Sequence, residues 1–238
     1  MPEQVVTISA SFDPCVMTRG LPGRTDGTFA TDAVEEAVER IQVRVGAADA
    51  VAVGPGLGRS DAVIQLVAHL WRHLPQPAVF DADALWALAQ LDGQLAGHAG
   101  PRIPPPHAGE LLRLVGADPS SAAADDRPML EERAATLAAA MSVVVVLKGP
   151  ATLITDGRRR VHNDTGNPGM ATAGTGDVLT GVVAALLAQG LDPFAAARLA
   201  AWVHGRAGDV AAEALGEVSM TARDLLDRLP VAFREVGG

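Results

Sequence analysis

The residues best suited to chemistry lie where a glycine-rich segment runs into an apolar helix, within Thr165–Leu191. Gly174, Thr175 and Gly176 open the predicted helix, and the free N–H groups and positive dipole end of a helix N-terminus attract an anion such as phosphate. A carboxylate in a first helical turn often only complements the helix dipole, but inside a phosphate site it would repel the ligand. We therefore interpret Asp177 as a general base that takes a proton from a hydroxyl during phosphoryl transfer.

A second candidate follows the clearest predicted strand, the apolar run Val143–Leu147. Lys148 ends this run, and the carboxyl ends of parallel strands are where ligands commonly bind. A lysine there could be a solvated end residue, but the phosphate site downstream favours contact with a nucleotide. A predicted hairpin, 153–155 with 160–162, turns at Asp156-Gly157.

Two acids and a histidine follow other predicted strands. Asp81 and Asp83 come after the strand 78–80, where paired acids could hold a metal ion. The alternative is that Asp83 caps the helix and Asp81 hydrogen-bonds neighbouring backbone, which we prefer for Asp83 and leave open for Asp81. His107 begins a helix after a strand near Arg102–Ile103. It could cap that helix, but its place at the same sheet edge favours contact with a ligand.

A glycine-rich turn, Gly54 to Gly58, follows the predicted strand 50–53. Its glycines either let a ligand approach the backbone or only permit a tight turn, and the sequence leaves these alternatives equal. The spacing does not match the dinucleotide fingerprint or the P-loop.

Alternating strands and helices must bring these residues together. The remaining predicted helices cover 31–44 with Thr31 as cap, 61–74, 84–90, 129–141, the segment from Thr175 to Gly190, 193–215, and a last helix capped by Thr221 that Pro230 kinks or ends. Glycines such as Gly205 and Gly208 would allow close packing. Val5–Ile8 is a short apolar patch. The alternation indicates an α/β fold with a mostly parallel central sheet.

Composition limits the kinds of protein this chain can be. With 238 residues, 48% hydrophobic and 20% charged, it suits a single domain spanning 1–238. A net charge of −9 argues against a nucleic-acid partner, and no apolar run reaches the roughly 20 residues of a membrane helix. The single cysteine, Cys15, excludes an internal disulfide, and without a signal pattern we expect a cytoplasmic protein.

Taken together, the motifs resemble the ADP/ATP-dependent NAD(P)H-hydrate dehydratase family, a branch of the ribokinase-like fold. The resemblance runs from about Ala50 to the C-terminus. It is carried by VGPGLG at Val53–Gly58, FDADAL at Phe80–Leu85, PHAGEL at Pro106–Leu111, LKGPATLITDG at Leu147–Gly157, NPGMATAGTGDVLTG at Asn167–Gly181 and DLLDRLP at Asp224–Pro230. It implies a three-layer αβα architecture.

The resemblance also implies an activity, the ADP-dependent dehydration of the S-epimer of hydrated NADH or NADPH to NADH or NADPH, with AMP and phosphate as products. ADP or ATP would be the co-substrate, with Mg²⁺ bound to its phosphates and no protein ligand assigned. Family members are often homotetramers. The matching substrate positions are Gly58, His107 and Asp177, with Asp177 as catalytic base. The matching nucleotide positions are Lys148, Gly149, Pro150, Ala151, Thr152, Gly174, Thr175 and Gly176.

Two departures and two alternatives accompany this resemblance. The family usually has a strand and a glycine-rich turn ahead of the point where this chain starts, so we expect the natural start to lie upstream. Pro105 stands where the family commonly has threonine. A ribokinase-like kinase of a small alcohol or vitamin precursor would share the phosphate site and Asp177, whereas the PHAGEL motif fits the dehydratase better. A non-catalytic nucleotide-binding remnant is the other alternative.

Overall fold

The computed structural model describes residues 3–13, 15–21, 23–25, 29, 34–45, 49–91, 95, 97–120 and 124–237. The strands are β1 (Val51–Val53), β2 (Ala78–Phe80), β3 (Arg102–Ile103), β4 (Val145–Leu147), β5 (Leu153–Thr155) and β6 (Arg160–His162). The α-helices are α1 (Val6–Ala10), α2 (Val34–Val45), α3 (Asp61–His73), α4 (Asp83–Ala89), α5 (Ala108–Leu114), α6 (Arg127–Met141), α7 (Thr175–Ala188), α8 (Pro193–Leu215) and α9 (Ala222–Val236). Short 3₁₀ turns cover Glu3–Val5 and Pro168–Met170.

The strands form two ladders that hydrogen bonds join into one sheet. β1, β2 and β3 pair in parallel, whereas β4, β5 and β6 form an antiparallel meander. Alternate N–H groups around β4 donate to alternate carbonyls around β3, from Val144 to Arg102, from Val146 to Pro104 and from Lys148 to Pro106. This spacing is that of a parallel pair, but Pro104 and Pro106 have no N–H with which to return hydrogen bonds. The prolines therefore shorten β3 without separating the two halves of the sheet.

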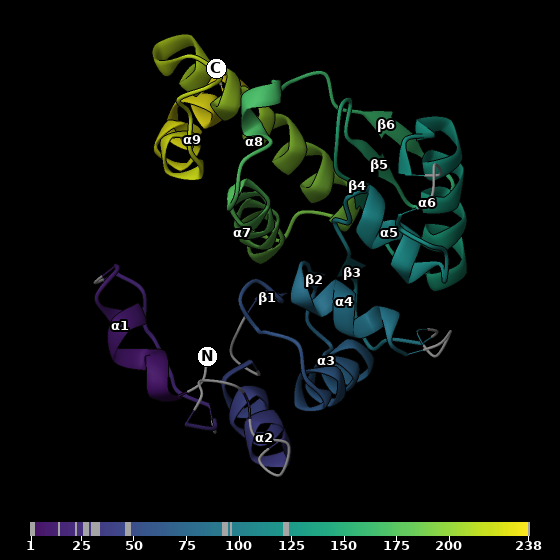
Figure 1. Ribbon diagram of the computed structural model, residues 1–238, viewed down its shortest axis with the longest axis vertical. Coiled ribbons are helices and arrows are strands. Elements are labelled where there is room, and N and C mark those ends of the chain that lie inside the picture. The colour runs from purple at the N-terminus through teal and green to yellow at the C-terminus, as the bar shows by residue number, and fades with distance from the viewer. Residues whose placement is uncertain are drawn as a thin grey trace.

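Helices cover both faces of this sheet. Successive strand residues point to opposite faces, so Val79 and Val146 pack with α7 and α8, whereas Phe80 and Leu147 pack with α3 to α6. Figure 1 shows α7 and α8 on one side of the strands and α3 to α6 on the other. The predicted three-layer αβα architecture is confirmed. Within the described residues, no helix combines the length and apolar character needed to cross a membrane.

Several local predictions are confirmed and others are wrong. Thr221 caps α9, and the hairpin pairs Thr155 with Arg160. Pro230 lies inside α9, which continues to Val236, so the proline does not end the helix. Val5–Ile8 belongs to the helical turns at the start of the chain. The predicted cap Thr31 lies outside the described residues.

The glycines of α8 make the close contacts that the sequence predicted. A Cβ on Gly205 would lie 2.2 Å from Thr165 Oγ1, and one on Gly208 would lie 2.4 Å from Met170 Sδ. A larger residue at position 205 would require the backbone of the neighbouring loop to move, whereas one at position 208 would require the Met170 side chain to shift. Helix α8 is therefore seated directly against the glycine-rich segment that leads into α7.

A buried arginine ties the sheet to the end of α3. Arg102 is 1% exposed, and its guanidinium donates to the carbonyls of Trp71, Leu74 and Gln76. These carbonyls lie at or just beyond the C-terminus of α3, where a cation also complements the helix dipole. Burial lowers the pKa of Arg102 to about 10, which still leaves it charged at neutral pH.

We expect Arg102→Met to lower the free energy of unfolding by about 3 kcal/mol, because several buried carbonyls lose their donors at once. Urea denaturation measures this change. Arg158→Met is the matched control, because the side chain of Arg158 is exposed. Equal unfolding midpoints for the two variants would show that Arg102 contributes nothing specific.

Candidate active site

The predicted site residues gather at the carboxyl ends of the parallel strands. Asp81 follows β2, Lys148 follows β4, and the N-terminus of α7 lies against both. A Cβ on Gly176 would lie 3.6 Å from Lys148 Nζ and 4.0 Å from Asp81 Oδ2. The edge of the sheet that commonly binds ligands in α/β folds thus holds a lysine, a buried acid and a helix N-terminus.

Asp81 is the centre of this arrangement. Its side chain is 1% exposed and accepts hydrogen bonds from Lys148 Nζ at 2.9 Å, Thr180 Oγ1 at 2.6 Å and the Ala82 N–H at 2.8 Å. It therefore links β2, β4 and α7. The metal alternative gains no support, because no group of three or more candidate ligands gathers among the described residues. The backbone carbonyl of Asp81 also lies close to Gly54, where an added Cβ would be 1.7 Å from the carbonyl oxygen.

Lys148 supplies the positive charge of the site. Its side chain is 20% exposed, and Nζ lies 3.5 Å from Glu110 Oε2 in addition to its contact with Asp81. Two carboxylates on different elements therefore hold the ammonium group next to Gly176. A lysine fixed in this way presents a point charge to an anion at the start of α7.

The start of α7 has the geometry of an anion site. The helix begins at Thr175, as predicted, after Gly174 in a left-handed conformation with φ of +89°. Thr175 Oγ1 donates to the carbonyls of Met170 and Thr172, so this hydroxyl holds the preceding loop. The backbone N–H groups of the first turn remain to bind an anion.

Asp177 lies in that first turn and is exposed. Its pKa is raised above the ordinary aspartate value, first by partial removal from water and then by the charge of Asp81, whereas Lys148 opposes the rise. A raised pKa makes the carboxylate a better proton acceptor, which suits a general base.

We expect the activity of this site to rise with pH through an acidic limb that lies above 3.8, the ordinary aspartate value, because Asp177 must be ionised to accept a proton. Asp81→Asn should move this limb to lower pH, since it removes a charge that raises the pKa of Asp177. The pH dependence of kcat/KM measures both effects. The exposed Asp227→Asn on α9 is the control, and a limb that stays in place in Asp81→Asn would contradict the assignment.

His107 caps α5, which was the alternative to ligand contact. Its Nδ1 accepts from the N–H groups of Gly109 at 3.1 Å and Glu110 at 3.4 Å, while Glu110 Oε2 accepts from the His107 N–H. Burial lowers the pKa of His107, with Lys148 adding to the effect and Glu110 opposing it. In the neutral ring the proton is then on Nε2, because Nδ1 is an acceptor. Contact between His107 and a substrate stays a prediction, and it would use the Nε2–H group.

The preference for Asp83 as a helix cap is wrong. Ala82 is the N-cap of α4, and the Asp83 carboxylate instead accepts from the Gly58 N–H at 2.9 Å and contacts Arg59 Nε at 3.4 Å. Gly58 has a φ of +77°, and a Cβ there would meet no atom within 4 Å. Asp83 thus fixes the glycine turn so that Gly58 faces open space. The carbonyl and Cα of Gly58 are the groups left to contact a ligand.

The predicted nucleotide loop Gly149–Thr152 connects β4 to β5. Its backbone includes positive φ values of +136° at Gly149 and +49° at Ala151, and Thr152 Oγ1 donates to the Gly149 carbonyl at 3.1 Å. The guanidinium of Arg127, in the first turn of α6, donates to the carbonyls of Leu147, Lys148 and Ala151. The structure thus brings this loop together with Lys148, and Arg127 fixes its shape.

Sequence reasoning missed the residues that support the site from other elements: Glu110, Arg127, Thr180 and His204. Thr180 follows Asp177 by about one helical turn, so helical periodicity could have placed it on the same side of α7. Arg127 and His204 carry no local signal, because their partners come from distant parts of the chain.

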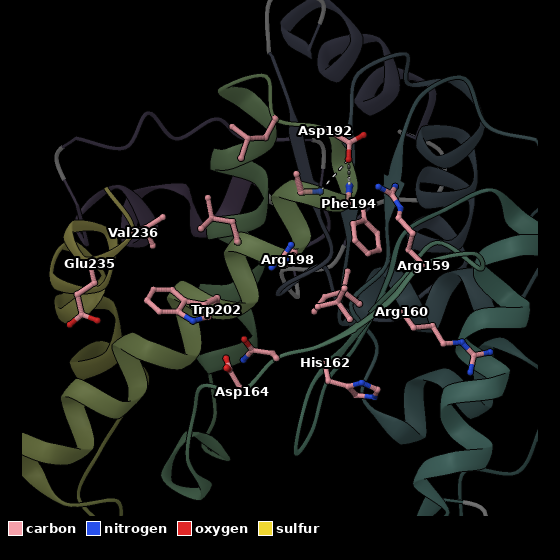
Figure 2. A pocket seen from close by; sticks show the side chains of 16 residues that line it. Arg159, Arg160, His162, Asp164, Asp192, Phe194, Arg198, Trp202, Glu235 and Val236 are labelled. Carbon is pink, nitrogen blue, oxygen red and sulfur yellow. Dashed lines mark hydrogen bonds between the residues drawn. The ribbon is translucent and has the colours of Figure 1, made fainter. Parts of the chain in front are cut away.

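A large cavity lies elsewhere in the described part of the chain. It has a volume of about 1030 Å³ and lies between β6, α8 and the end of α9 (Figure 2). Arg159 stacks on Phe194 at 4.0 Å in its wall, with Trp202 further along α8. None of the predicted site residues lines it. We place the candidate active site at the strand ends, because Asp177, the ammonium group of Lys148 and the N-terminus of α7 meet there.

The fold and this site define a ribokinase-like protein. A ribokinase-like superfamily protein of Enterococcus faecalis V583 matches with a TM-score of 0.65 and 26% identity, over 84% of this chain and 68% of that one. An ADP/ATP-dependent NAD(P)H-hydrate dehydratase from Bacillus subtilis, co-crystallised with ATP and Mg²⁺ and soaked with CoA, matches with a TM-score of 0.70 and 26% identity. That match covers 92% of this chain and 82% of the other.

Sequence comparison narrows the class to one family. The family model described as NAD(P)H-hydrate dehydratase matches residues 16–231. A bifunctional NAD(P)H-hydrate repair enzyme from Moorella thermoacetica is 44% identical over 238 residues, which are 99% of this chain and 43% of that protein. The chain belongs to the NAD(P)H-hydrate dehydratase family, as its motifs predicted, and it spans less than half the length of this relative.

Proposed function

We propose that this protein dehydrates the S-epimer of hydrated NADH or NADPH to the reduced cofactor and converts ADP to AMP and phosphate. The observation that carries the proposal is the start of α7, where Asp177 and the anion-binding N–H groups lie beside the ammonium group of Lys148. This arrangement supplies a proton acceptor and a phosphate site within one helical turn, as phosphoryl transfer requires.

In the first proposed step, the ring hydroxyl of the hydrated cofactor attacks the terminal phosphorus of ADP. The hydroxyl proton passes to Asp177, the new oxygen–phosphorus bond forms, and the bond from that phosphorus to AMP breaks with its electron pair leaving on AMP. The N–H groups of Gly174 to Gly176 and the ammonium group of Lys148 stabilise the charge on the transferring phosphoryl group.

In the second proposed step, the phosphorylated ring expels phosphate. The lone pair of the ring nitrogen assists the break of the carbon–oxygen bond, whose electron pair leaves on phosphate. Loss of a neighbouring ring proton to solvent restores the double bond. Phosphorylation helps because hydroxide is a poor leaving group, whereas phosphate is a good one. The assigned contacts are Gly58 and His107 with the hydrated cofactor, and Lys148 with the loop Gly149–Thr152 with the nucleotide.

The proposed Mg²⁺ ion would travel with the nucleotide. The carboxylates of Asp81 and Glu110 both contact Lys148, and the described residues offer no cluster of ligands. Side chains arranged in this way fit an ion that is held by the phosphate oxygens of the nucleotide and by water. When bound, the ion would neutralise phosphate charge. We also propose a cytoplasmic location, which fits the single cysteine, and a homotetramer, as the family resemblance implies.

The direct test incubates the protein with hydrated NADH and ADP and follows the absorbance of reduced nicotinamide. The proposal expects absorbance to rise with equal release of AMP. A kinase of a small alcohol would give a phosphorylated alcohol from a nucleotide donor and no new absorbance from hydrated NADH. A nucleotide-binding remnant would bind ADP without turnover.

A further inference from the structure

A buried histidine on α8 contacts the first residue of α7. His204 is 9% exposed, and its Nε2 lies 2.8 Å from the carbonyl oxygen of Thr175. A carbonyl oxygen only accepts, so Nε2 carries the proton and donates it. Burial lowers the pKa of His204 to about 4, so the ring is neutral in the pH range where the site would work.

The accepting carbonyl belongs to the same peptide group as a phosphate-binding donor. The C=O of Thr175 and the N–H of Gly176 are the two ends of one planar peptide unit. A hydrogen bond to the carbonyl oxygen fixes the plane of that unit and polarises it, which strengthens its N–H as a donor. The Gly176 N–H is one of the donors of the anion site, and Lys148 Nζ lies next to this residue.

The packing of α8 gives this contact a rigid base. Gly205 approaches Thr165 so closely that an added Cβ would clash with its backbone, and Gly208 lies against the side chain of Met170. Helix α8 is therefore packed closely against the loop that precedes α7. His204 extends from this fixed helix to the first peptide group of α7.

We propose that His204 is a positioning residue for phosphoryl transfer, which orients and polarises the Thr175–Gly176 peptide group so that its N–H meets the transferring phosphoryl oxygen. The inference rests on the proposed function and adds a residue to it. His204 does not touch the substrate. Its effect is greatest when charge builds up on the phosphoryl oxygens, so it acts on turnover more than on binding of ADP.

The test compares His204→Phe, which keeps an aromatic ring but loses the donor, with His204→Gln, whose side-chain amide can donate from a similar position. We expect His204→Phe to lower kcat about tenfold, less than the roughly hundredfold cost of removing such a donor itself, with the Kd of ADP changed by about twofold or less. His204→Gln should recover most of the lost kcat. If His204→Phe does not fold, His204→Leu replaces it.

A neighbouring variant separates this role from a loss of stability. Val203 is buried on α8 and packs with Leu225 and Ala232 of α9. Val203→Ala should lower the melting temperature and leave kcat unchanged. A kcat for His204→Phe equal to that of the parent would overturn the inference, and so would equal losses in the Phe and Gln variants, since a donor would then have no part.

Binding of AMP with orthovanadate, a mimic of the transferring phosphoryl group, gives a readout that needs no turnover. The inference expects weaker binding in His204→Phe and recovery in His204→Gln. If the three proteins show this binding pattern but the parent does not dehydrate hydrated NADH, the proposed function fails and the role of His204 stands. If the parent dehydrates hydrated NADH and the three proteins bind the mimic equally, the role of His204 fails alone.

Discussion

Asp177→Asn should lower the turnover of hydrated NADH by about two to four orders of magnitude, the usual range for loss of a general base. Asparagine keeps the size of the side chain but cannot accept the hydroxyl proton. Steady-state kinetics with hydrated NADH and ADP measure the change. Binding of ADP should stay nearly intact, because the N–H groups of the first turn of α7 belong to the backbone.

The same variant tests the alternative in which Asp177 only complements the helix dipole. If Asp177 had only that role, Asp177→Asn would lower turnover by well under a factor of ten, since interactions with a helix dipole at an exposed site contribute about 0.3–1 kcal/mol. Asp177 is exposed, so the substitution should leave the melting temperature nearly unchanged. Turnover by Asp177→Asn at the parent rate would remove Asp177 from the mechanism.

Lys148→Ala should weaken ADP binding by about tenfold to a hundredfold, the range expected for a lost charge-assisted hydrogen bond to phosphate. Binding of the hydrated cofactor should weaken less, because Lys148 is assigned to the nucleotide. Calorimetric titration of each ligand measures the two affinities. Equal losses for both ligands would contradict the division of the site into two subsites.

The control for Lys148→Ala must address Asp81, which is 1% exposed and would lose its cation. An uncompensated buried charge destabilises the fold by itself. The double variant Lys148→Ala with Asp81→Asn removes both charges and should recover much of the stability. Its ADP affinity should remain as weak as in Lys148→Ala, which separates binding from folding.

The order of the elements and the phosphate site could be predicted because both are local in sequence. The apolar run before Lys148 marks a buried strand, and glycines before an apolar helix mark the start of α7. The shortness of β3 also has a local cause, since Pro104 and Pro106 lack the N–H groups that a longer ladder needs.

The contacts that complete the site could not be predicted, because they join residues far apart in the chain. Asp81 meets Lys148 across 67 positions and Thr180 across 99. Asp83 was expected to cap its own helix, but its carboxylate accepts a hydrogen bond from the Gly58 N–H, 25 positions away. Side-chain type and local spacing specify the chemistry, whereas the order of the strands in the sheet decides which of these groups meet.

The most direct measurement of the proposed mechanism follows the oxygen atom of the ring hydroxyl. Hydrated NADH labelled with ¹⁸O at that hydroxyl is converted with ADP, and the phosphate and water formed are analysed by mass spectrometry. Attack of the hydroxyl on phosphorus followed by loss of phosphate places the label in inorganic phosphate. Label found in water, with unlabelled phosphate, would show that the hydroxyl leaves without being phosphorylated and would contradict the role given to Asp177 and the start of α7.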